Sequence, residues 1–190
     1  MMRSLMATSM ASGLLAALCA AGAGTAHATS LVDNLTCEAK DAALTFAKGV
    51  TDTPAANSYT LTGNLINCES MSGTYPNVDH GTVVAVGSGT LSCGATDSFN
   101  GNATFTWYDA SNRNVGTTTV SFQGGGKGTS DSGDISNHET GITNATSTVA
   151  PLNNYDSSFA PTGFTGSCTD PGGVTALTGD NFFDFSLIQV

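Results

Sequence analysis

The sequence predicts an all-β fold, an antiparallel β-sandwich of about eight strands, with a small β-barrel as the alternative. The chain contains three consecutive strand-like runs, Thr82–Cys93, Asn102–Asp109 and Gly116–Gln123, and apolar and polar residues alternate in the second and third. A period of two is typical of half-buried antiparallel strands. Polar connections separate the runs, so we interpret them as a β-meander. The meander carries the chain's only tryptophan, Trp107, and we expect it to hold the densest part of the core.

The stretch Leu31–Val50 is compatible with two structures. Its Ala, Glu, Lys and Leu residues favour a helix. Ala42, Leu44 and Phe46 nevertheless alternate with other residues, as in a strand. The residues alone therefore leave helix and strand open.

The stretch Ser58–Asn67 is predicted to be a strand with Tyr59, Leu61 and Leu65 on one face. Before it, Thr51–Asn57 is predicted to be a loop, because its proline cannot sit in a central strand.

The second half of the chain contains weaker signals. Gly124–Gly141 is rich in glycine and poor in apolar residues, so we expect it to be the least ordered internal segment. Ile142–Ala150 is predicted to be a weak strand and Pro151–Gly163 a turn. The closing run FFDFSLIQV alternates and is predicted to be the last strand.

The first residues are typical of a secretory signal peptide. Arg3 precedes an apolar run from about Leu14 to Ala21, and Ala-His-Ala then offers a cleavage site after Ala28. That run is too short to span a membrane. We therefore expect a signal peptide over residues 1–28, a single secreted domain over residues 29–190, and no membrane span after signal removal.

The charge of the chain excludes some partners. Removing Arg3 leaves 4 of the 5 basic residues against 15 acidic ones, a net charge of 4 − 15 = −11. Such an acidic chain is not expected to bind nucleic acid or anionic membrane surfaces. We therefore expect an extracellular or cell-envelope partner, whose identity the sequence does not give.

Four cysteines remain after cleavage: Cys37, Cys68, Cys93 and Cys168. An even number in an exported chain predicts two disulfides, and the spacing does not favour a zinc site. Three pairings are possible. We predict Cys68–Cys93, because these residues end consecutive strands, which are usually neighbours. Cys37–Cys168 would then link the first and last strands.

Five short motifs are distributed over nearly the whole chain after residue 28. They are A-L-T-F-x-x-G-V-T-x-T-P (Ala43–Pro54), Y-T-L-T-G (Tyr59–Gly63), G-S-G-T-L-S-C (Gly87–Cys93), A-T-F-T-W (Ala103–Trp107) and C-T-D-P-G-G-V-T (Cys168–Thr175). In this order they resemble a group of small exported β-rich proteins of filamentous Gram-positive bacteria, whose members have no assigned activity. The resemblance implies that Ala43–Ala47 is a strand and assigns no functional residue.

Two adjacent pairs, Asp79-His80 and His138-Glu139, have the residue types of an acid/base pair. Adjacent residues on a strand point to opposite faces, and both pairs lie in loop-like sequence. We therefore expect solvated loop residues. No nucleophile-elbow motif accompanies either pair, so no catalytic residue is assigned.

Two further sets of residues are weak candidates for binding. Asp131, Asp134 and Glu139 offer oxygen ligands of the kind that Ca²⁺ prefers. No cofactor other than such a structural calcium is expected. Tyr108 is predicted to face away from the Trp107 side of its strand, which makes it a candidate for a contact surface.

The sequence supports three functions in decreasing order. The first is a secreted, non-catalytic β-sandwich that acts as an extracellular or envelope-associated interaction module. The second is a β-barrel that carries a small ligand in an apolar cavity. The third is a secreted hydrolase with carboxylates brought together in space. A filled core favours the first, and an apolar internal cavity favours the second.

Overall fold

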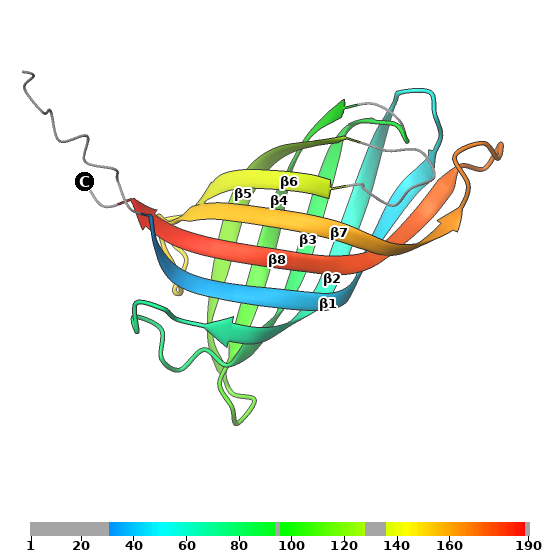
Figure 1. The fold of residues 1–190 in the computed structure, drawn as a ribbon. Coiled ribbons are helices and arrows are strands. Elements are labelled where there is room, and N and C mark those ends of the chain that lie inside the picture. The colour runs from blue at the N-terminus through cyan, green and yellow to red at the C-terminus, as the bar shows by residue number, and fades with distance from the viewer. Residues whose placement is uncertain (1–30, 94–95, 128–135, 189–190) are drawn as a thin grey trace, which may run out of the picture.

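A computed structural model describes residues 31–93, 96–127 and 136–188, and the fold of this part is a closed β-barrel (Figure 1). Its strands are β1 (Leu31–Val50), β2 (Ala55–Glu69), β3 (His80–Leu91), β4 (Thr96–Tyr108), β5 (Asn114–Lys127), β6 (Ser136–Thr143), β7 (Asn154–Gly166) and β8 (Val174–Ile188). Each strand pairs antiparallel with its neighbours in sequence. Within these ranges, no helix is long and apolar enough to cross a membrane.

Pairing of β1 with β8 closes the barrel, so the predicted sandwich is wrong and its alternative is confirmed. The two strands pair from Leu31 opposite Ile188 to Val50 opposite Val174. Inward and outward residues alternate along a strand in both architectures, so alternation cannot separate them. We call the end where β1 begins and β8 ends the proximal end, and the other the distal end.

Leu31–Val50 is a strand, and it includes Ala43–Ala47, for which the resemblance implies a strand. Ala42 and Leu44 are buried and Phe46 is partly buried, so the alternating residues do line the interior. The strand is irregular at Asp41, which has a φ of 53°, and the pairing register shifts there. The local preference for helix is overridden by pairing with β2 and β8.

The predicted meander is confirmed as β3, β4 and β5, and aromatic rings fill the interior beside it. Trp107 is fully buried and stacks on Phe105 at a centroid distance of 5.6 Å. Phe183 and Phe185 on β8 approach Phe105 edge-on, at 5.2 and 5.1 Å. The Trp107 indole N–H donates to the hydroxyl of Thr118 at 2.8 Å, so its one polar atom is satisfied.

The second half of the chain is more regular than predicted. The expected turn Pro151–Gly163 lies mostly in β7, and the prediction there is wrong. Inward residues of β7 include Tyr155 and Phe159, whose alternation was masked by polar neighbours. The predicted disordered segment Gly124–Gly141 begins within β5 and ends within β6, while residues 128–135 lie outside the described residues.

The four cysteines form two disulfides, but the predicted pairing is wrong. The bonds are Cys37–Cys68 and Cys93–Cys168, with Cα–Cα distances of 4.2 and 6.0 Å. Cys68 ends β2 and Cys93 follows β3, and consecutive antiparallel strands end at opposite ends of a barrel. Cys68 therefore pairs with its neighbour on β1. Cys93 pairs with Cys168, in the β7–β8 connection at the same distal end.

A side chain at Gly124 is expected to destabilise the barrel. A Cβ atom there would lie 2.5 Å from Cζ of Phe99 and 2.6 Å from the carbonyl oxygen of His138. Because a backbone atom cannot move away freely, we expect Gly124→Ala to lower the free energy of unfolding by about 1–3 kcal/mol. Urea denaturation measures it. Gly172→Ala is the control, because a Cβ at Gly172 meets nothing within 4 Å. Equal stability of the two variants would contradict this packing.

Candidate functional site

A carboxyl group lies inside the barrel between two tyrosines on other strands. The side chain of Glu139, on β6, accepts hydrogen bonds from the hydroxyls of Tyr59 at 3.3 Å and of Tyr155 at 3.0 Å. Tyr59 lies on β2 and Tyr155 on β7, so the contact with Tyr59 spans the interior. Both rings are buried, at 6% and 2% exposure. This cluster ties three strands together.

Burial raises the pKa values of all three side chains in this cluster. Removal of the carboxylate from water raises the pKa of Glu139 to about 7, although the two tyrosine hydrogen bonds and His138 act in the opposite direction. Burial and the nearby Glu139 carboxylate also raise the pKa of each tyrosine well above its usual value. Both phenols are therefore hydrogen-bond donors at neutral pH, and neither is poised as a base.

A concave feature lies on the outer wall of the barrel, where β4, β5 and β6 run side by side. It is a hollow of about 470 Å³. Its lining residues are Ser98, Phe99, Asn100, Gln123, Gly124, Gly125, His138 and Thr140. Five of these residues are exposed on the outer wall, namely Ser98, Asn100, Gln123, His138 and Thr140.

The absence of a side chain at Gly125 explains the hollow. Gly125 pairs with Ser98 on one side and with His138 on the other. Neighbouring strands are about 4.8 Å apart, so the two polar residues flank an open strip about 10 Å wide. Asn100, Gln123 and Thr140 form the next row of paired residues. The glycine run that suggested a flexible loop thus forms the floor of a surface site.

His138 is fixed at one rim of the hollow. Its Nε2 atom lies 2.8 Å from a carboxylate oxygen of Asp156 on β7, and both side chains are about half exposed. The expectation of solvated loop residues is wrong for His138 and Glu139, because both lie in strand β6. His138 points outward and Glu139 inward, as adjacent strand residues must. The described lining of the hollow contains no carboxylate.

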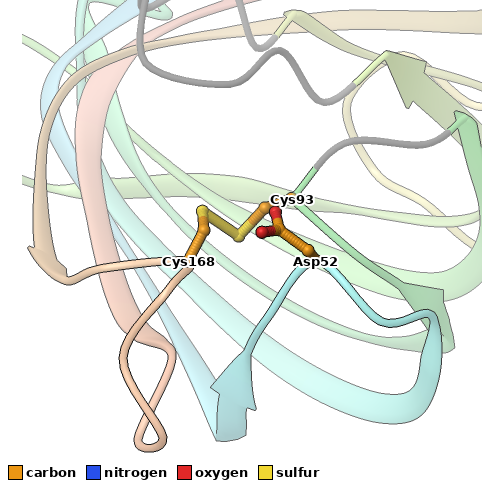
Figure 2. Close-up of side chains that lie close together, drawn as sticks. All are labelled: Asp52, Cys93 and Cys168. Carbon is orange, nitrogen blue, oxygen red and sulfur yellow. A yellow bond between two sulfur atoms is a disulfide. The ribbon is translucent and has the colours of Figure 1, made fainter.

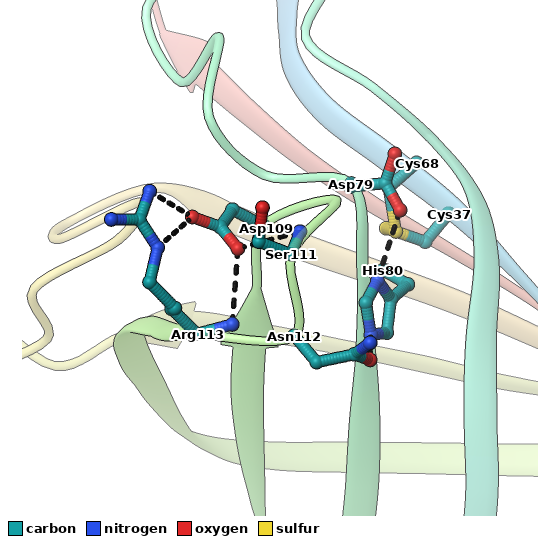
Figure 3. A network of polar contacts seen from close by, with 8 residues as sticks. All are labelled: Cys37, Cys68, Asp79, His80, Asp109, Ser111, Asn112 and Arg113. Atoms are coloured by element: carbon teal, nitrogen blue, oxygen red, sulfur yellow. Dashed lines mark hydrogen bonds and ion pairs between the residues drawn. A yellow bond between two sulfur atoms is a disulfide. The ribbon is translucent and has the colours of Figure 1, made fainter.

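Asp79 and His80 lie at the proximal end, away from the hollow. The His80 ring is 2.9 Å from Asp79 and 3.1 Å from the side-chain oxygen of Asn112 (Figure 3). It also stacks on Tyr108, with 5.5 Å between ring centroids. These contacts hold the start of β3 against the β4–β5 turn. Tyr108 does face outward, and its role as a contact residue stays a prediction.

The β4–β5 turn has its own charged contact. Arg113 binds Asp109 with an N–O distance of 2.6 Å, and backbone N–H groups of Ser111 and Arg113 donate to the same carboxylate (Figure 3). Hydrogen bonding by the Arg113 backbone and side chain lowers the pKa of Asp109. This arrangement is a closed turn and offers no free ligand atom of the carboxylate to a substrate.

Asp52 lies beside the Cys93–Cys168 disulfide at the distal end (Figure 2). The three side chains are close enough to hold a metal ion. The sulfur atoms are bonded to each other, however, and the thiolate is the form that binds metals. We therefore regard the group as a disulfide with a neighbouring carboxylate.

The part of the chain that the structure describes does not show a calcium site formed by Asp131, Asp134 and Glu139. Asp131 and Asp134 lie outside them, and Glu139 is turned inward and engaged by two tyrosines. The calcium site stays a prediction.

The hollow was not predicted from the sequence, because glycine, serine and asparagine at the end of a strand resemble loop sequence. Gly125 pairs with Ser98 on one neighbouring strand and with His138 on the other, and no local sequence pattern predicts these long-range contacts.

Comparisons with protein-family models, curated proteins and solved structures found no match to this chain. The fold and the site together define a disulfide-linked, closed antiparallel β-barrel with a polar hollow on its outer wall. The two disulfides fit an oxidising, extracellular environment.

Proposed function

We propose that this protein is a secreted, non-catalytic interaction module that binds a neutral, hydroxyl-rich ligand, a glycan, in the hollow around Gly125. The observation that carries the proposal is the position of the hollow on the outer wall. Large apolar side chains such as Phe105 and Phe183 occupy the interior. That arrangement supports recognition on the outside over carriage of a ligand inside.

The chemistry of the lining supports a glycan. Hydroxyl and amide side chains both donate and accept hydrogen bonds, and sugar hydroxyls do the same. Among the lining residues only His138 can carry a charge. The acidic chain disfavours an anionic ligand, because like charges repel.

A peptide ligand fits this site less well. Extended peptides are commonly bound by adding a strand to an exposed sheet edge. At the hollow, β5 is paired with β4 on one side and β6 on the other, and a closed barrel has no free edge. Backbone pairing is therefore unavailable, and side chains must supply recognition.

Hydrolysis at the same hollow is the second candidate, favoured by the His138–Asp156 hydrogen bond. A carboxylate that orients an imidazole is a recurrent catalytic arrangement. Glycoside hydrolysis, however, ordinarily requires two carboxyl groups flanking the scissile bond, and the described lining provides none. Incubation with a bound oligosaccharide distinguishes the two candidates. Release of shorter products that is abolished by His138→Gln would favour the enzyme.

A printed array of neutral and anionic glycans tests the proposed function. We expect wild-type protein to bind neutral glycans. Gly125→Leu places a side chain in the hollow, and we expect it to weaken binding by about tenfold or more, the loss of about 1.4 kcal/mol. Ala160→Leu, at an exposed position of β7, is the matched control and should bind as wild type. Absence of neutral glycan binding, or binding unaffected by Gly125→Leu, would refute the proposal.

A further inference from the structure

The outer wall next to the hollow carries a surface without charge. It is formed by Val86, Asn102 and Ser121 in one row of paired residues and by Val84, Thr104 and Thr119 in the next. We call these six residues the neutral face. Val84 and Val86 are 50% and 53% exposed, so their methyl groups are open to solvent. The face lies on β3, β4 and β5.

The neutral face is continuous with the hollow. Asn100 and Gln123, which line the hollow, are two residues along the same strands from Asn102 and Ser121. Side chains two residues apart in a strand lie on the same face. From Ser98 to Thr104 the distance along β4 is about 20 Å, at roughly 3.3 Å per residue. Hollow and face together form a track longer than one sugar ring.

Charged residues lie elsewhere on the barrel. The segments 58–64, 82–90, 98–106 and 117–123 of β2 to β5 contain no Asp, Glu, Lys or Arg. Exposed charges include the Lys40–Asp180 ion pair at 2.9 Å on β1 and β8, Glu69 at the end of β2, and Asp156 on β7, which contacts His138 at the rim of the hollow. In a chain with 15 acidic residues this separation leaves one wall suited to an uncharged partner.

We infer that the neutral face extends the hollow into a binding track for a neutral glycan chain, so that the ligand is a polysaccharide or long oligosaccharide. This inference rests on the proposed function of the hollow. The Thr and Asn side chains supply hydrogen bonds to sugar hydroxyls. The methyl groups of Val84, Val86 and Thr104 supply apolar contact for the C–H surface of a sugar ring.

A second copy of the chain is a less suitable occupant of this surface. Three strand spacings and a length of 20 Å give an area of about 300 Å². A stable protein interface buries about 800 Å² on each partner. The net negative charge of the two copies would also oppose their association. A slender chain that lies along the strands needs far less area than a protein.

The dependence of affinity on chain length tests the inference. The probes are the disaccharide and the hexasaccharide of the neutral gluco- and chito-oligosaccharide series, titrated by isothermal calorimetry. We expect the hexasaccharide to bind wild type about tenfold more tightly than the disaccharide. Thr104→Glu should remove this advantage and leave disaccharide binding unchanged. Thr175→Glu, at an exposed position of β8, is the matched control and should keep the advantage.

Each outcome separates this inference from the proposed function. Equal affinity for short and long chains, with both lost in Gly125→Leu, would overturn the track and leave the hollow as the glycan site. Failure of wild type to bind either probe series or any neutral glycan on the array would overturn both. A wild-type dimer that Thr104→Glu converts to a monomer in sedimentation analysis would show that a second copy occupies the face.

Discussion

Removal of the Cys93–Cys168 disulfide is expected to lower the free energy of unfolding by about 4 kcal/mol. The two cysteines are 75 residues apart in sequence, and the bond joins the β3–β4 and β7–β8 connections across the distal end. In the chain-entropy model, the loss comes from the greater freedom of the unfolded chain. Guanidinium denaturation of wild type and of Cys93→Ser/Cys168→Ser, both under non-reducing conditions, measures it.

The second disulfide provides a matched comparison. Cys37 and Cys68 are 31 residues apart and lie on strands that already pair. The chain-entropy model gives about 0.8 kcal/mol less stabilisation for this shorter separation. We therefore expect Cys37→Ser/Cys68→Ser to be the more stable double variant. The opposite order would contradict the loop-length argument, and a Cys68–Cys93 peptide in non-reducing mapping would contradict the pairing itself.

Neutralising Glu139 is expected to remove a pH dependence of stability. The folded-state pKa of about 7 lies above the ordinary value of 4.5. Between these values the folded protein holds a proton that the unfolded chain has lost, so raising the pH favours unfolding. The stabilisation is complete below pH 4.5 and is lost as the pH rises through about 7. At about 1.4 kcal/mol per pKa unit, the upper limit of the loss over 2.5 units is about 3.5 kcal/mol.

The variant Glu139→Gln tests this expectation, because an amide can accept from one tyrosine and donate to the other. We expect its free energy of unfolding to change less than that of wild type between pH of about 4.5 and 7.5, and to exceed the wild-type value at the upper end. Glu69→Gln removes an exposed carboxyl group at the end of β2 and is the control. Identical pH profiles for wild type and Glu139→Gln would show that Glu139 is not buried as described.

Local patterns predicted the elements whose two faces differ in polarity. Tyr59, Leu61 and Leu65 are buried on one face of β2, and Trp107 lies at the centre of the core, as the alternation indicated. Patterns failed where inward positions are polar or small. In β6 the inward residues are Glu139, Gly141 and Thr143, and none of them is a large apolar residue, so the strand shows no apolar alternation.

The sequence patterns did not predict which distant strands pair with each other. The choice between sandwich and barrel depends on whether β1 pairs with β8, and no local signal reports this contact. The disulfide pairing did not depend on this contact, because Cys68 and Cys93 end consecutive antiparallel strands and so lie at opposite ends of the barrel. The candidate site shows the same limit. Gly125 became meaningful only when Ser98 and His138 were placed on either side of it.

The central claim is that this barrel binds its ligand on the outer wall and not in the interior. Titration of isotope-labelled protein with a neutral hexasaccharide, followed by backbone amide NMR shifts, tests it most directly. The account predicts that the largest amide shifts occur at Ser98, Gly125 and His138 and continue along the neutral face, while the aromatic ring signals of Phe105 and Phe183, which point into the interior, stay unchanged in the same titration. Shifts concentrated at the interior residues, or none on the outer wall, would contradict it.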